Sequence, residues 1–269
     1  LSRAVTYLIF PYKRRNWDMV TSPAKHVTPR LLSAYALDPS RAALTGSPRS
    51  DAVLRKPPES VPVIDQLRES GRRGKIIIYA PTFRGHPKSG LGSDNDLVPE
   101  GPLRTVDAML VRQDATLLVS MHFFREGRSQ LNEARFERIR LLGIEESSDI
   151  TLLLPHADVL ITDFSSLYYD YLLLDRPIVF APFDYESYTT GDRELYDDYE
   201  EVTPGPRCTS WEEVSSTLDE ILSGRDLYAE SRARVRPFFQ HFVDTQNSAR
   251  VVAATRRLLE GKPPDRPAT

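Results

Sequence analysis

The chain has 269 residues, 40% hydrophobic and 27% charged, which is ordinary for a globular protein with room for one large or two modest domains. A formal net charge of −3 argues against a nucleic-acid partner, so any anion site must be local. The single cysteine excludes an internal disulfide framework and a cysteine-based zinc site, and it favours a reducing cytoplasm. No apolar run approaches the ~20 residues that a membrane-spanning helix needs.

The first half of the chain alternates between strand and helix patterns. Short strands are predicted at residues 19–21 and 43–45, with a helix at 28–37 between them. The charged, proline-containing stretch Arg55–Pro58 is the best candidate for a linker. The patterns beyond it predict, in order, a helix at 63–69, a strand at 75–79, a helix at 103–112 and a strand at 116–120.

Residues 157–181 carry the most informative pattern. The apolar run Val159–Ile161 is too short for a helix, and a turn with two hydroxyls and a carboxylate follows it. Next come an aromatic helical stretch and, after Asp175-Arg176-Pro177, a second buried strand, Ile178–Ala181. Further helices are predicted at residues 211–222, 227–238 and 248–259. Strand–helix alternation of this kind favours an α/β fold, a parallel sheet covered by helices on both faces.

Ser165 and Ser166 lie between a strand and a helix, where a side chain can cap the helix and free N–H groups attract an anion. In an open α/β sheet, ligands bind at this edge. The sequence therefore predicts a phosphate site at these two serines. The alternative interpretation is an ordinary helix cap in a strand–helix loop.

Three other residues are predicted at the same edge because each closely follows an apolar strand. His122 follows the strand at 116–120, and Thr82 and Arg84 follow the strand at 75–79. An imidazole there can donate a hydrogen bond to a diphosphate, and the threonine and arginine suit phosphate or backbone contacts. The alternatives are a hydrogen-bonded loop histidine and a structural ion pair of Arg84 with Asp163.

Acidic residues complete the predicted site. Asp163 is expected to accept backbone N–H groups of its own loop rather than to act as a general base. Asp170 is expected to anchor the loop or reach a ribose, and Glu201 to hold a ribose, although both could be solvated acids. The other histidines have no ligand-like spacing. No metal motif, Walker loop or cofactor signature occurs, so no cofactor is expected.

Several segments resemble the CDP-glycerol glycerophosphotransferase family of teichoic acid polymerases and primases. Residues 78–84 (IYAPTFR) resemble its YAPTWR segment, and residues 160–171 (LITDFSSLYYDY) its LITDYSS block. Five further blocks follow the family's order: Trp17-Asp18, Thr45–Asp51, Asp175–Ile178, Asp184–Tyr188 and Tyr199–Pro206. Each block is weak alone, but together they are specific and cover most of the chain.

The resemblance implies a GT-B-like fold and a phosphotransfer reaction. A hydroxyl of a lipid-linked polyol-phosphate or glycan would attack the β-phosphorus of CDP-glycerol or CDP-ribitol and release CMP. His122 would be catalytic, with Thr82, Arg84, Asp163, Ser165, Ser166, Asp170 and Glu201 binding substrate. Positioning and electrostatic stabilisation dominate such chemistry, so a metal is optional. A lipid-linked acceptor also implies weak peripheral contact with the inner face of the cell membrane.

The resemblance also implies an HG-x-P-x-K block whose histidine activates the acceptor hydroxyl, and no His-Gly pair occurs in this sequence. We therefore expect residues 1–55 to be a remnant of the acceptor domain, 56–245 a nucleotide-binding Rossmann-like domain and 246–269 a C-terminal helix and tail. We expect the chain by itself to bind the donor without appreciable transfer.

Two alternative functions fit the same fold class. One is a GT-B glycosyltransferase or epimerase that uses a UDP-sugar, although such sites favour a Gly-rich turn after a strand, and none follows a strand here. The other is a non-catalytic nucleotide-binding fragment that needs a second chain.

Overall fold

The computed structural model describes residues 17–55, 61–82, 99–120, 133–143, 149–191 and 195–262. The chain divides into two compact units. We call residues 56–235 the sheet unit, and residues 1–55 together with 236–269 the terminal unit. Each is described by itself below.

The sheet unit contains a five-stranded sheet in which every pairing is parallel, as the sequence predicted. Its strand order is β5-β4-β3-β6-β7, so the first strand lies in the centre and the chain builds outward from it in both directions. The strands are β3 (Lys75–Ala80), β4 (Ala115–Val119), β5 (Ile139–Leu141), β6 (Val159–Thr162) and β7 (Ile178–Phe180).

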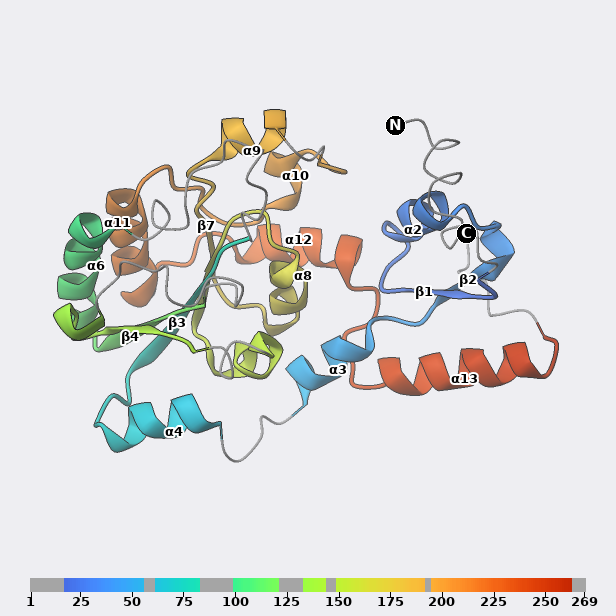
Figure 1. Cartoon of the computed structure of the whole chain (residues 1–269), viewed down its shortest axis with the longest axis horizontal. Helices are drawn as coiled ribbons and strands as arrows, with labels where there is room; N and C mark the ends of the chain where they lie inside the picture. The colour runs from blue at the N-terminus through green and yellow to red at the C-terminus, as the bar shows by residue number, and fades with distance from the viewer. Residues whose placement is uncertain are drawn as a thin grey trace. The chain divides into compact units, whose positions relative to one another are not determined.

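Alternating side chains of the central strands face two different helix layers. One set of apolar strand residues, including Ile77 and Leu117, packs with Leu103 and Val214 in a single core cluster. Figure 1 shows the corresponding helices, α6 (Glu100–Arg112) and α11 (Trp211–Leu222), side by side on one face of the sheet. The other face is covered by α8 (Leu167–Tyr171), whose Tyr168 packs edge-on against Phe180 with ring centroids 5.1 Å apart.

Several elements were not predicted from the sequence. These are β5, whose three residues include an arginine, and the helices α3 (Pro48–Leu54), α9 (Tyr185–Gly191) and α10 (Tyr199–Val202). The helix predicted after Ser166 is shorter than its apolar pattern. It tightens into a 3₁₀ turn at Leu172–Leu174 and ends at Asp175, which adopts the left-handed conformation with φ 49°. The helix predicted at residues 63–69 is present as α4 (Pro62–Glu69). Further 3₁₀ turns lie at Pro39–Arg41, Glu133–Arg135, Ile150–Leu152 and Leu154–His156.

The terminal unit has its own small parallel pair, β1 (Val20–Ser22) and β2 (Ala42–Leu44), joined by α2 (Thr28–Tyr35). The C-terminal part of the chain returns to this unit. The division between units falls within α12 (Ala229–Phe239), and α13 (Asn247–Leu259) packs against α3. None of the helices in the described ranges is long and apolar enough to cross a membrane.

A buried carboxylate joins the start of α13 to α3. Asp51, 2% exposed, accepts hydrogen bonds from the backbone N–H groups of Asn247 (2.9 Å) and Ser248 (2.8 Å). Nearby, Gly46 has φ +76°, and a Cβ at this position would overlap the side-chain amide of Asn247. The contact therefore depends on both a helix-capping carboxylate and a glycine turn.

We predict that Asp51→Asn lowers the free energy of unfolding by about 1–3 kcal/mol, because one charge-assisted acceptor of two buried N–H groups becomes neutral. Urea denaturation gives the magnitude. Hydrogen exchange locates the effect, which should appear as faster exchange at the first amides of α13. A matched control is Glu220→Gln, which removes the same charge from a solvent-exposed pair with Arg225 and should cost less than about 1 kcal/mol.

The Asp51 contact also predicts a pH dependence. Burial raises the pKa of the Asp51 carboxyl, but hydrogen bonds from Ser248 and Asn247 and the charge of Arg55 outweigh it and bring the pKa below its ordinary value. The stabilisation is complete above the unfolded pKa of about 3.9 and disappears as the pH falls through the lower folded pKa. Acid sensitivity equal in the wild type and Asp51→Asn would contradict this assignment.

Candidate functional site

The topology identifies one position on the sheet as the place for a ligand. The chain runs from β3 outward to β4 and β5, and then returns to the other side of β3 as β6 and β7. The order therefore reverses between β3 and β6, and in open α/β sheets ligands bind beyond the carboxyl ends of the strands at this switch point. Ala80 and Thr162 are register partners at the end of the two strands, so the residues that follow them meet at this point.

Asp163 joins the two strand ends. Its carboxylate oxygen Oδ1 accepts three hydrogen bonds, from the backbone N–H of Thr82 (2.7 Å), the hydroxyl of Thr82 (2.6 Å) and the backbone N–H of Phe164 (2.6 Å). The residue is 1% exposed. A carboxylate engaged in this way holds the loop after β6 against the loop after β3, and it is poorly placed to accept a proton from a substrate.

Ser165 and Ser166 follow directly in the loop held by Asp163. The hydroxyl oxygen of Ser165 accepts a hydrogen bond from the backbone N–H of Leu167 (3.3 Å), which leaves its proton available for donation outward. Ser166 directly precedes α8, and its side chain is exposed, without a capping hydrogen bond to the helix. The simple helix-cap interpretation thus does not account for Ser166.

Aromatic side chains from α9 and α10 hold the same loop from the other side. Phe164 stacks on Tyr188 of α9, with ring centroids 3.9 Å apart and planes inclined by 3°. Tyr199 of α10 donates its hydroxyl to the backbone carbonyl of Asp163 at 2.9 Å, and its ring lies 5.3 Å from that of Phe164. The loop is therefore held by a carboxylate on one side and by an aromatic layer on the other.

The two remaining acids differ in exposure. Asp170 is 1% exposed on α8, so the interpretation of this residue as a solvated acid on the helix surface is wrong. Glu201 is exposed on α10, next to Val202. Helix α10 is itself capped by Asp198, whose carboxylate accepts a hydrogen bond from the N–H of Glu200 (2.9 Å). Glu201 therefore sits on an element that Tyr199 ties to the Asp163 loop.

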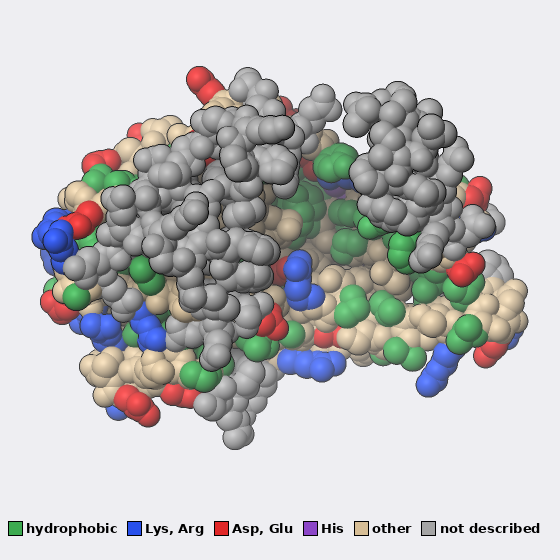
Figure 2. All heavy atoms as spheres, viewed as in Figure 1, with side chains coloured by type: hydrophobic (Ala, Val, Ile, Leu, Met, Phe, Trp, Pro, Cys, Tyr) green, Lys and Arg blue, Asp and Glu red, His purple; other side chains and the backbone are tan. Residues whose placement is uncertain are grey.

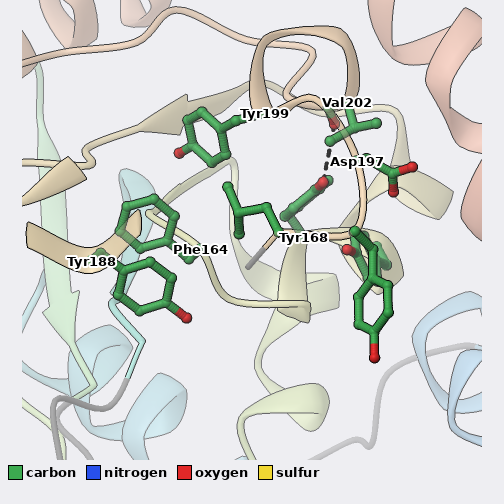
Figure 3. Close-up of a pocket in the computed structure, with 9 residues that line it drawn as sticks. Phe164, Tyr168, Tyr188, Asp197, Tyr199 and Val202 are labelled. Carbon is green, nitrogen blue, oxygen red and sulfur yellow. Dashed lines mark hydrogen bonds between the residues drawn. The ribbon is translucent and has the colours of Figure 1, made fainter. Parts of the chain in front are cut away.

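A pocket of about 190 Å³ lies beside this loop (Figure 3). Phe164 of the loop and Val202 of α10 both line it, so it borders the elements that carry the two serines and Glu201. Among the described residues, its lining consists mainly of aromatic side chains: Phe164, Tyr168, Tyr169, Tyr188, Leu195, Tyr196, Asp197, Tyr199 and Val202.

The structure thus brings together Thr82, Asp163, Ser165 and Ser166 at the switch point. His122 and Arg84 lie outside the described residues. Sequence reasoning missed the parts of Phe164 and Tyr199 in this arrangement. The sequence did show an aromatic residue directly after Asp163 and several tyrosines after β7. Which of these rings meet is decided by packing across the sheet edge, which the sequence does not show.

Two of the other histidines have structural surroundings. His26 stacks on Phe238 with centroids 4.9 Å apart, and burial lowers the pKa of His156, assisted by the charges of Arg68 and Arg176. Within the described ranges, no group of three or more His, Cys, Asp or Glu side chains is arranged to hold a metal ion.

Comparison with known proteins identifies the family. The model of the CDP-Glycerol:Poly(glycerophosphate) glycerophosphotransferase family matches residues 4–256. The chain belongs to this family. Its curated relatives include a teichoic acid glycerol-phosphate transferase of Staphylococcus aureus, 27% identical over 90% of this chain, and a teichoic acid poly(glycerol phosphate) polymerase of Staphylococcus epidermidis, 27% identical over 88%. The chain spans only 61% and 32% of these two proteins.

Solved structures agree with the family assignment. The wall teichoic acid polymerase TagF, from a crystal soaked with CDPG, superposes with a TM-score of 0.74 at 25% identity, over 95% of this chain and 62% of TagF. A UDP-N-acetylglucosamine 2-epimerase has a TM-score of 0.58 at 17% identity, which shows a common fold alone. The resemblance and the GT-B-like α/β fold class inferred from the sequence are therefore confirmed.

The hydrogen bonds between Asp163 and Thr82 predict that substitutions at these two residues lower the free energy of unfolding by different amounts. Asp163→Ala leaves two N–H groups and a hydroxyl without their acceptor and should lower the free energy of unfolding by at least about 2 kcal/mol. Thr82→Val removes only the hydroxyl and should cost about 1 kcal/mol. Urea denaturation of both variants tests the order, and a larger cost for Thr82→Val than for Asp163→Ala would refute the role assigned to the carboxylate.

Proposed function

We propose that the chain is the donor-binding part of a transferase that moves glycerol phosphate or ribitol phosphate from a CDP-polyol to a hydroxyl of a lipid-linked cell-wall or capsule polymer. The observation that carries the proposal is the family match over residues 4–256, together with a rigid polar loop at the switch point of the sheet. The curated relatives are named for glycerol-phosphate and ribitol-phosphate transfer in teichoic acids.

The reaction forms one bond and breaks one. The acceptor oxygen attacks the β-phosphorus of the donor, and the bond between that phosphorus and the bridging oxygen breaks. The electron pair leaves with CMP, and the proton of the acceptor hydroxyl goes to a base. Negative charge accumulates on the diphosphate oxygens, so preorganised hydrogen-bond donors at that position lower the barrier.

Each site residue has a proposed part in this chemistry. The hydroxyls of Ser165 and Ser166 donate to the diphosphate, and His122 and Arg84 stabilise the charge that the departing CMP acquires. Thr82 and Asp163 act through the loop that they hold. Asp170 and Glu201 are proposed to act on the ribose side of the donor.

We also propose a separate role for each of the two units. The sheet unit carries the switch-point loop, and we assign donor binding to it. The segment 1–55 with the returning C-terminal helix is assigned to the acceptor side of the reaction, and residues 246–269 serve to complete that unit. A lipid-linked polyol-phosphate or glycan is the proposed acceptor.

Ligand-observed NMR with CDP-glycerol, CDP-ribitol, UDP-GlcNAc and CMP tests the donor class. The proposal requires saturable binding of a CDP-polyol in preference to UDP-GlcNAc. Stronger binding of UDP-GlcNAc would replace it with UDP-sugar chemistry. Release of CMP in the presence of acceptor, with and without an added segment that carries an HG-x-P-x-K block, separates a competent enzyme from a nucleotide-binding fragment.

We predict that replacing both Ser165 and Ser166 with alanine weakens CDP-glycerol binding about tenfold or more, since two donors to the diphosphate are lost. CMP lacks the β-phosphate and should be affected much less. His122→Ala should show the same selectivity with a smaller loss. A control of the same size is Ser216→Ala on α11, whose hydroxyl donates to Glu213 within its own helix. Equal losses for CDP-glycerol and CMP would indicate misfolding rather than lost phosphate contacts.

Membrane contact is proposed to be weak. Figure 2 shows hydrophobic and basic side chains along α13, but two basic groups of the segment 250–262 are engaged within the protein. Arg250 stacks over Phe242 at 3.6 Å and pairs with Asp244, and Lys262 pairs with Glu260 at 2.8 Å. Arg256 is exposed.

We therefore predict marginal binding to anionic vesicles that is lost at high salt, because stable anchoring usually requires two signals. Vesicle sedimentation at low and high ionic strength measures it. Arg256→Gln should reduce the low-salt binding, whereas Arg225→Gln, in the segment after α11 in the sheet unit, should not. Binding that survives high salt would disprove purely electrostatic contact.

A further inference from the structure

Two buried tyrosines bracket residues 163–168, which we call the serine segment. Tyr199 of α10 donates its hydroxyl to the backbone carbonyl of Asp163, at the start of the segment, over 2.9 Å. Tyr168 of α8, at the end of the segment, donates its hydroxyl to the backbone carbonyl of Val202 in α10 over 3.0 Å (Figure 3). The two bonds therefore join both ends of the serine segment to the same short helix.

The rings of the two tyrosines rest on the same strand end. Tyr168 and Tyr199 both pack edge-on against Phe180, the last residue of β7, with ring centroids 5.1 and 6.2 Å away. The backbone of Phe180 is itself bonded on its outer side, since its N–H donates to the carbonyl of Pro206 and its carbonyl accepts from the N–H of Cys208. The two hydroxyls are thus carried by rings that pack on a fixed part of the sheet.

Within the serine segment, the backbone at Leu167 sets the direction of the Ser165 hydroxyl. The N–H of Leu167 donates to Oγ of Ser165 at 3.3 Å, so the proton of that hydroxyl points away from this bond. Leu167 directly precedes Tyr168, and its N–H moves with the backbone of that residue. Loss of the Tyr168 or Tyr199 hydroxyl removes a donor from a backbone carbonyl and releases one end of the segment.

We propose that Tyr168 and Tyr199 are positioning residues for donor binding. Through their bonds between the serine segment and α10, they hold the serine hydroxyls where the diphosphate of a CDP-polyol binds. The inference rests on the proposed function and extends it, because the two tyrosines act through the serine segment rather than through contacts of their own with the diphosphate. Hydrogen-bond donors that are already in place bind a charged ligand more strongly than mobile ones, because the cost of ordering them on binding is avoided.

Removal of one hydroxyl at a time tests the positioning role. Tyr168→Phe and Tyr199→Phe keep the ring, and titration calorimetry on the full chain should show an affinity for CDP-glycerol that is about fivefold lower in either variant. The affinity for CMP, which lacks the β-phosphate, should change much less. The matched control is Tyr171→Phe on the same helix, because the buried Tyr171 hydroxyl donates to the backbone carbonyl of Ala157 at 3.0 Å. Ala157 precedes β6 at the amino end of the sheet, so this variant should leave the CDP-glycerol affinity unchanged.

A double-mutant cycle separates positioning from a general loss of structure. In a chain with both Ser165 and Ser166 replaced by alanine, Tyr199→Phe should lower the CDP-glycerol affinity by less than about twofold further, because the hydroxyls that it positions are already absent. A purely structural role for Tyr199 predicts the same loss with and without the serines. Equal losses in the two backgrounds would overturn the proposal.

Amide hydrogen exchange tests the two bonds without nucleotide. The amides of Phe164 and Leu167 should exchange at least about threefold faster in Tyr168→Phe and Tyr199→Phe, and at the wild-type rate in Tyr171→Phe. Unchanged exchange at both amides would contradict the inference.

The binding data also distinguish this inference from the proposed function. A wild-type chain that binds no CDP-polyol would refute the proposed function and the positioning role with it. A wild-type chain that binds CDP-glycerol, with the same affinity in Tyr168→Phe and Tyr199→Phe, would refute the positioning role alone.

Discussion

The arrangement of the candidate site depends on one carboxylate. Asp163 receives three short hydrogen bonds at a single oxygen, and these bonds join the loops that follow β3 and β6 where the strand order reverses. In a parallel sheet, the loops that follow neighbouring strands are separate segments of the chain. An interaction between these loops is therefore needed to hold them together as one binding surface. A buried, charged acceptor does this more strongly than a neutral one, because charge-assisted bonds are shorter and the donors would otherwise be unsatisfied.

The aromatic layer of α9 and α10 gives the same loop a second support. Stacking of Phe164 on Tyr188 and the hydrogen bond from Tyr199 to the Asp163 carbonyl come from elements that follow β7. Phosphoryl transfer gains mainly from positioning and from preorganised donors, so a loop held on two sides suits the proposed chemistry. The same rings also line the neighbouring pocket, so the residues that support the Asp163 loop shape that pocket as well.

The terminal unit relies on a different long-range contact. Asp51 and Asn247 are 196 positions apart, yet the N–H of Asn247 donates to the Asp51 carboxylate within a fully buried environment. The helix that ends the described chain is therefore an integral part of the unit that begins it. The family model, which matches residues 4–256, covers segments of both units.

The sequence by itself determined the parallel α/β sheet, the positions of its apolar strands along the chain and the placement of Thr82, Asp163, Ser165 and Ser166 after strand ends. These features follow from local periodicity and from the direction that every parallel strand shares. The seven segments that resemble motifs of the family also indicated which family the chain belongs to. It did not reveal β5, because the run Ile-Arg-Leu is too short and mixed to stand out as a strand.

Only the tertiary structure decided which side chains meet. Phe164 lies in the loop after β6 and Tyr188 on α9, and their pairing depends on how the chain closes over the carboxyl edge of the sheet. The burial of Asp170 depends likewise on which face of α8 turns to the sheet. Contacts of this kind arise from packing between elements that are distant in sequence, and no local pattern of residues specifies them.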